Sequence, residues 1–176
     1  RTGDEQALRQ GVEAIDFYLR NGETRTPGLY YGDFQADANR WTPATFHGGA
    51  QGISSRQFGE IFDRLCDAVI QARKMRLPQA AGWEAAVRRA GDFLLAAPRI
   101  GGMFPRAWKE DGTILGDPAL PGALSAAGAT CAAALVRIGR ITGERKYIDA
   151  AAAAMDAYHG EFLSGGPMPP WGATID

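Results

Sequence analysis

A short motif, an aspartate followed by two apolar or aromatic residues, recurs in this chain as Asp16-Phe17-Tyr18, Asp92-Phe93-Leu94 and Asp156-Ala157-Tyr158. Each copy stands near the end of a helix-like run, and the motif returns after 76 residues (from 16 to 92) and after 64 residues (from 92 to 156). A unit of that length accommodates two helices and a long loop, so the repeat predicts an array of helical hairpins. Because the aspartates recur together with the helices, we interpret them as residues of hairpin packing or helix-end contacts.

The composition is that of a globular protein. The 176 residues are 45% hydrophobic and 22% charged, with a formal net charge of −1, which is enough chain for one domain with a core. Without a basic stripe or a long apolar run, the sequence predicts neither nucleic-acid binding nor a membrane span.

The sequence also predicts no metal and no cofactor, since it has two histidines and no ligand pair at zinc spacing. Cys66 and Cys131 lie in helical patterns and are expected to be buried thiols.

Apolar spacing predicts five helices, over residues 4–20, 54–75, 81–97, 124–141 and 144–163. Ser54 or Ser55 is a candidate N-cap of the second helix. Short turns and long loops alternate, so both long loops, 21–53 and 98–123, are expected at one end of the array. Counted along the chain, the second and fourth helices should form one layer, and the first, third and fifth helices another. The predicted fold class is all-α, with antiparallel hairpins that form part of an (α/α) toroid.

Three motifs carry a resemblance to a known group of proteins. They are Gly101–Arg106 followed by Asp111–Thr113, then Pro121–Gly128, and then Ile138–Ala151, which contains the turn Thr142-Gly143-Glu144. They resemble the α/α-toroid proteins, the six-hairpin glycosidase-like superfamily, well over residues 80–170 and more loosely over 5–75. The resemblance implies a ring of hairpins with a substrate cleft at one end and carbohydrate chemistry by Asp and Glu. It does not choose among glucuronyl hydrolases, other glycosidases, epimerases and lyases.

The chain is shorter than a closed six-hairpin ring, which at about 70 residues per hairpin needs over twice this length. We therefore expect one domain, residues 1–176, that is a fragment of a larger toroid, with hairpins at 1–78 and 79–143 and the start of a third at 144–176. The open flank beside the fifth helix is expected to be covered by another copy or by the remainder of a larger chain.

Aromatic residues gather in the long loops. Sugar sites use aromatic faces for stacking, but loop tryptophans also fold back over helix ends as local core, and the sequence leaves both interpretations open. His47 either binds a substrate hydroxyl or acts as a base, or else it lies in solvent. Arg106 either binds a sugar carboxylate or pairs with Glu110 or Asp111. The predicted substrate-binding residues are Tyr31, Trp41, His47, Arg106, Trp108 and Trp171.

Asp33 and Asp117 are the predicted catalytic pair, because glycoside hydrolysis needs one carboxylic acid and one carboxylate. Asp33 follows Tyr30-Tyr31-Gly32, and Asp117 precedes Pro118. The alternative for each is an ordinary turn residue, which is also the interpretation of Asp111 before Gly112.

Two functions follow from these residues. The first is a glycoside hydrolase-like domain that acts on a sugar or uronate oligomer through paired carboxylates. The second is a non-catalytic helical-repeat module that binds a glycan or a protein. A terpenoid-cyclase-type toroid is a third class, but it requires an Asp-rich acid motif that this sequence lacks. The expected ligand is therefore a carbohydrate, and the sequence does not assign a compartment.

Overall fold

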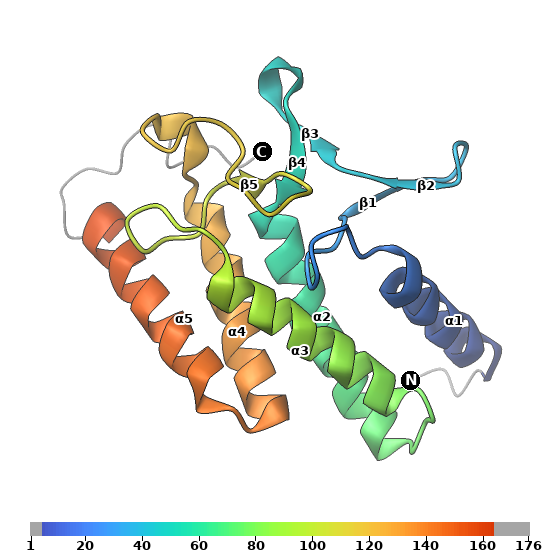
Figure 1. Ribbon diagram of the computed structural model, residues 1–176. Helices are drawn as coiled ribbons and strands as arrows, with labels where there is room; N and C mark the ends of the chain where they lie inside the picture. The colour runs from blue at the N-terminus through green and yellow to red at the C-terminus, as the bar shows by residue number, and fades with distance from the viewer. Residues whose placement is uncertain (1–4, 164–176) are drawn as a thin grey trace.

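The computed structural model describes residues 5–163. Within this range the fold is dominated by five α-helices, with short turns at one end and long connecting segments at the other (Figure 1). The helices are α1 (Glu5–Asn21), α2 (Ser55–Lys74), α3 (Ala80–Ala96), α4 (Ala129–Thr142) and α5 (Arg145–Tyr158), and a π-helical turn (His159–Leu163) follows α5.

The helix ends follow signals that are present in the sequence. Ser54 caps α2, where its Oγ accepts a hydrogen bond from the Gln57 amide at 3.4 Å. Gly143 ends α4 in the left-handed conformation, with φ 74°, which glycine adopts without a steric penalty. The prediction of five helices is confirmed, and most boundaries agree to within a residue or two.

Two boundaries differ more: the fifth α-helix ends at Tyr158 and not at residue 163, and the fourth begins at Ala129 and not at Leu124. Leu124 forms a β-bridge with Pro105. Ser125 is extended, and its Oγ accepts a hydrogen bond from the Ala127 amide at 3.2 Å. Bonds to a neighbouring loop and two 3-10 turns, Pro121–Ala123 and Ala126–Gly128, therefore replace the first helical turn that the apolar run predicts.

The helices pack in two layers. α2 and α4 lie against each other in one layer, while α3 contacts both α1 and α5 in the other. α4 also packs on α5, and α2 on α3, so the layers are joined by the hairpins. Gly59 permits the close approach of α2 to α4, because a Cβ at this position would lie 2.4 Å from the Thr130 carbonyl carbon.

The chain is not strictly all-α, because the long connections contain short antiparallel strands. β1 (Asp33–Gln35) pairs with β2 (Arg40–Thr42), with Phe34 opposite Trp41. A second sheet has the order β3 (Ala44–Thr45), β4 (Gln51–Ser54) and β5 (Ala107–Trp108). The β1–β2 turn contains Asn39 with φ 46°, a conformation that asparagine tolerates better than most residues. These strands and the long loops lie at the same end of the helices (Figure 1).

The repeated aspartates join successive helices of the odd-numbered layer. Asp16 on α1 accepts a 2.6 Å hydrogen bond from Trp83 Nε1 on α3. Asp92 on α3 accepts a 2.7 Å hydrogen bond from the Tyr147 hydroxyl on α5 and a 3.0 Å bond from Lys146 Nζ. The prediction that these residues serve helix packing is confirmed for Asp16 and Asp92.

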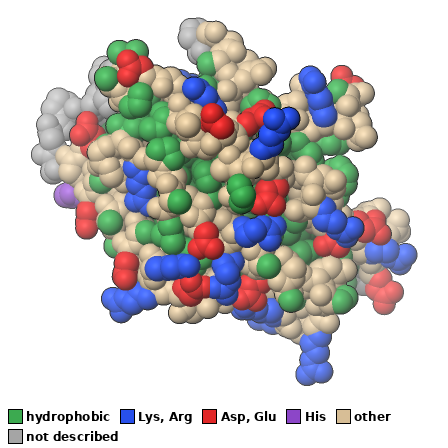
Figure 2. Space-filling model, in the orientation of Figure 1, with side chains coloured by type: hydrophobic (Ala, Val, Ile, Leu, Met, Phe, Trp, Pro, Cys, Tyr) green, Lys and Arg blue, Asp and Glu red, His purple; other side chains and the backbone are tan. Residues whose placement is uncertain are grey.

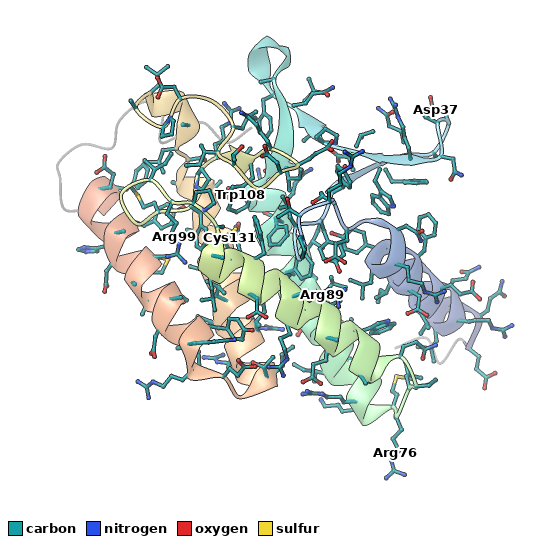
Figure 3. All side chains as sticks on the ribbon, in the orientation of Figure 1. Asp37, Arg76, Arg89, Arg99, Trp108 and Cys131 are labelled. Carbon is teal, nitrogen blue, oxygen red and sulfur yellow. The ribbon has the colours of Figure 1, made fainter. Side chains whose placement is uncertain are left out.

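The first loop is also tied to α3. Arg89 donates from Nη2 to the Tyr30 hydroxyl at 3.0 Å and from Nε to Glu23 Oε1 at 3.3 Å, and Figure 3 shows Arg89 on the side of α3 near this loop. Burial and the Glu23 carboxylate raise the pKa of Tyr30 to about 12, against a smaller lowering effect of Arg89. The phenol therefore stays protonated as part of this network.

Two further expectations concern the interior and the surface. Cys66 and Cys131 are free and fully buried, as predicted, and burial raises the pKa of the Cys66 thiol to about 12. Within residues 5–163, no helix has the length and apolar character needed to cross a bilayer. On the face shown in Figure 2, cationic and anionic side chains are interspersed. Lys146 and Asp92 form an exposed ion pair, a type of contact that contributes little to stability.

Candidate functional site

A cavity of about 440 Å³ lies at the loop-rich end. The β3–β4 hairpin, the first turn of α2, the segment before β5 and the 3-10 turn before α4 form its walls. Segments from three parts of the sequence therefore meet at one site. The lining residues are Ala44, Thr45, Phe46, Ser54, Ser55, Arg56, Gln57, Glu60, Arg106, Ser125 and Ala127.

Ser55 fixes the wall of this cavity to the rest of the fold. Its amide and its hydroxyl each donate a 3.1 Å hydrogen bond to the Arg106 carbonyl oxygen. Its own carbonyl accepts hydrogen bonds from Thr130 Oγ1 at 3.4 Å and from Cys131 Sγ at 3.0 Å. The start of α2 is thus bonded both to the segment before β5 and to α4, so the positions of Arg56 and Arg106 are set by the tertiary structure.

The charged groups of the cavity are two arginines and one glutamate. The Arg106 guanidinium lies over the Phe46 ring, 4.8 Å from its centroid, a cation–π arrangement that orients the planar group. Arg56 Nε pairs with Glu60 Oε1 at 3.0 Å. The site therefore has a positive charge balance among the residues that line it.

The first turn of α2 adds to this positive character. Helix N-termini carry a partial positive charge and present backbone amides without helical partners. Ser54 satisfies one of these amides, that of Gln57. With Arg106 beside it, the helix end makes an environment that favours a carboxylate or another small anion.

Of the predicted site residues, Arg106 is in this cavity, but the predicted catalytic pair is not. Asp33 is half-buried at the start of β1, opposite Thr42. Asp117 is exposed, and its Oδ1 accepts a 2.9 Å hydrogen bond from the Ala119 amide. Asp117 therefore has the geometry of an Asx turn. Asp111 is also a turn residue, because its Oδ1 accepts from the Thr113 amide and hydroxyl at 3.0 and 2.6 Å.

Trp41 and Tyr31 lie in the first loop, outside the cavity wall. Trp41 is half-buried and packs with Phe34 and Tyr18, at centroid distances of 4.9 and 5.2 Å. It thus contributes to a local aromatic cluster between α1 and the β1–β2 hairpin. Tyr31 is half-buried, and burial together with a hydrogen bond to Glu110 raises its pKa.

The expectation of a stacking surface at Trp108 is corrected by its burial. Trp108 is 0% exposed and lies in the core, with Phe93 and Phe58 edge-on at 5.2 and 6.0 Å. Figure 3 shows it between the loops and the ends of the helices. The alternative noted for loop tryptophans, a place in the local core over the helix ends, is the one that this residue adopts.

The two remaining predicted residues are His47 and Trp171. His47 begins a 3-10 turn (His47–Gly49) at the tip of the β3–β4 connection. Trp171 lies outside the described residues. Across residues 5–163, no three His, Cys, Asp or Glu side chains gather into a group suited to a metal ion.

Sequence reasoning missed several residues of the cavity, among them Phe46, Gln57, Glu60 and Ser125. Phe46 stands next to His47 in the sequence, yet it has no motif of its own. Ser125 was assigned to a helix, and the Ser54-Ser55 pair was recognised only as a cap. Their role becomes visible when β4, β5 and the start of α4 are brought together, which no local pattern encodes.

Comparisons with protein-family models, with curated proteins and with solved structures gave no match.

Proposed function

We propose that this chain is a carbohydrate-binding α/α domain that takes an anionic sugar, such as a uronate, in the cavity at its loop-rich end. The observation that carries the proposal is the position of Arg106 beside the first turn of α2, in a cavity of about 440 Å³. A guanidinium binds a carboxylate through two parallel hydrogen bonds. The serine and threonine hydroxyls and the Gln57 amide in the same wall match the hydroxyl groups of a sugar.

The fold proposed for this function is part of an α/α toroid. Two layers of helices, with the long loops at one end, support this proposal, as do the hairpin motifs at 101–106 and 138–151. In such an arrangement the loop-rich end faces the substrate. Fold likeness does not set the reaction, so the chemistry must be judged from the site itself.

The site favours the binding module over the hydrolase. Glycoside hydrolysis needs two carboxyl groups about 5–10 Å apart. Among the described residues that line the cavity, Glu60 is the only carboxylate, and it is paired with Arg56. The hydrolase hypothesis keeps Asp33 and Asp117 as its acid and base. Under that hypothesis, catalysis takes place outside this cavity.

The binding proposal is tested with glucuronate and galacturonate oligomers, with the matching neutral oligomers as comparison. Titration followed by calorimetry or by NMR should show binding of the uronates. Loss of a charge-assisted hydrogen-bond pair in Arg106→Gln should weaken binding by about 10- to 100-fold. Arg140→Gln is the matched control, because Arg140 is exposed in the last turn of α4 and does not line the cavity. Equal binding of neutral and anionic oligomers, or no effect of Arg106→Gln, contradicts the proposal.

The hydrolase hypothesis has its own experiment. Turnover of chromogenic glycosides and uronate oligomers is measured for the unaltered chain, for Asp33→Asn and for Asp117→Asn. Turnover that falls at least 100-fold in both variants supports paired carboxylates. Uronate binding without turnover leaves the non-catalytic module as the function of these residues.

A further inference from the structure

α3 and α5, the two helices that donate a hydrogen bond to an aspartate of the preceding odd-numbered helix, each carry an aspartate of their own further along. Trp83 and Asp92 on α3 are nine residues apart, and so are Tyr147 and Asp156 on α5. At about 100° per residue, nine residues bring two side chains to opposite sides of a helix. α3 therefore binds α1 through Trp83 on one side and α5 through Asp92 on the other.

The side chains around each aspartate form the face that packs on the next helix. On α1 this face consists of Val12, Ile15 and Leu19 with Asp16, and all four are buried or half-buried. The equivalent positions on α3 include Gly91, which is buried against Tyr147 of α5, where a Cβ would lie 2.8 Å from the ring. In both helices that have a successor in the array, the residue before the aspartate is therefore covered: Ile15 is half-buried and Gly91 is buried, although the Asp92 side chain itself is 51% exposed.

The equivalent face of α5 is open. It consists of Ala152, Met155 and Asp156, with His159 in the following turn, and all four are exposed; Met155 is 46% exposed. Met155 occupies the position of Ile15 on α1 and of Gly91 on α3. The Asp156 carboxylate has no hydrogen bond or ion pair with another residue in the described range.

We propose that this face of α5 is a docking site for a further helix of the same kind, which comes from outside these 176 residues. That helix carries a tryptophan or tyrosine near its first turn, and the aromatic N–H or O–H donates a hydrogen bond to the Asp156 carboxylate. Its apolar side packs on Ala152 and Met155.

A second copy of this chain is a poorer occupant. Within the described α-helices, the aromatic donors that stand nine positions before an aspartate are Trp83 and Tyr147, and they are 4% and 0% exposed in their own contacts. At the corresponding position α1 has Ala7, which has no side-chain donor. The repeat chemistry therefore points to a helix other than the five of residues 5–163.

The probe is a helix-stapled peptide of residues 79–97, which carries Trp83 and is the segment that docks on the Asp16 face of α1. Titration into the isotope-labelled full chain should shift the amide resonances of Ala152, Met155, Asp156 and His159. Replacing Trp83 by Ala in the peptide, or Asp156 by Ala in the chain, should weaken binding about tenfold through loss of the charge-assisted hydrogen bond. Asp149→Ala is the matched control, because Asp149 is exposed on the same helix and pairs with Arg145.

Three results overturn the proposal. The first is no shift on α5 at millimolar peptide, and the second is binding that Asp156→Ala leaves unchanged. The third is a dimer in sedimentation that Met155→Asp dissociates, which assigns the face to a second copy. Shifts on α5 that depend on both Trp83 of the peptide and Asp156 of the chain support it.

Discussion

The contact of α1 with α3 and the contact of α3 with α5 each pair an aspartate with an aromatic donor, but the surroundings of the two pairs differ. At the first contact, Asp16 is only 18% exposed, and its donor Trp83 is buried. At the second, the Asp92 side chain is 51% exposed, whereas Tyr147 is fully buried and α5 has α4 as a further neighbour.

This difference shows how a repeated motif can carry unequal shares of stability. α5 packs on two helices, so most of its attachment comes from apolar burial. α1 has one buried residue, Leu19, and its main helix contact is with α3. For α1 the hydrogen bond from Trp83 is therefore a larger part of what holds the helix.

The largest expected effect concerns the packing of the α3–α5 contact. In Gly91→Val, the new side chain meets the buried Tyr147 ring and Ile138, with a Cβ already 2.8 Å and 3.0 Å from their atoms. Overpacking of this kind should lower the free energy of unfolding by about 3 kcal/mol. Chemical denaturation measures it. Gly82→Val on the same helix is the control, because its Cβ has no neighbour within 4 Å, and similar losses in both variants would contradict the account.

The second prediction compares the two hydrogen bonds by double-mutant cycles. Trp83→Phe with Asp16→Ala should give a coupling energy of about 2 kcal/mol, and Tyr147→Phe with Asp92→Ala about 1 kcal/mol or less. The physical reason is that solvent screens the exposed Asp92 carboxylate more strongly than the enclosed Asp16. Denaturant unfolding of the single and double variants gives both values, and a larger coupling at Asp92 would reverse the comparison.

The third and smaller effect is on the pH dependence of the α3–α5 contact. Partial burial raises the pKa of Asp92, but hydrogen bonds from Tyr147 and Lys146 outweigh it and hold the pKa below the ordinary 3.8. The resulting stabilisation is present above that ordinary value and is lost as pH falls through the lower folded pKa. Burial and the Asp92 hydrogen bond raise the pKa of Tyr147 above 10.0, so its contribution is present below pH 10 and lost as pH rises through the folded value.

Denaturant midpoints measured between pH 2 and pH 11 test this dependence. Asp92→Asn should flatten the acid side of the curve, and Tyr147→Phe the alkaline side. Asp149→Asn, on the exposed surface of α5, is the control and should leave both sides near those of the unaltered chain. An acid side that Asp92→Asn does not change would exclude this residue as a source of the pH dependence.

The smallest effect expected is a gain in stability on α1. Gly11 lies inside the helix, and a Cβ there meets no atom within 4 Å. Gly11→Ala should raise the stability of α1 by about 0.5–1 kcal/mol, since alanine loses less backbone entropy in a helix. Amide hydrogen exchange resolves this gain, because α1 should open locally before the α2–α5 core unfolds. Unchanged protection of α1 amides would indicate that α1 unfolds only with the rest of the protein.

Local signals in the sequence are sufficient to predict the helices and most of their ends. Apolar spacing, the Ser54 cap, the Gly143 stop and the recurrence of the aspartates are local signals, and each acts within a turn or two of the chain. The alternation of short and long connections also placed the loops at one end. The strands β1 to β5 were missed because stretches of two to four residues carry too little periodicity to be distinguished from loop.

Which loop residues face a cavity and which enter the core depends on how distant segments pack together. Trp41 and Trp108 are both loop tryptophans, yet the former packs in a cluster beside α1 and the latter is enclosed by Phe58 and Phe93. Arg106 reaches the start of α2 because Ser55 bonds to its carbonyl across 51 residues of sequence. Such placements depend on side chains from distant segments competing for the same space, and no single segment contains that information.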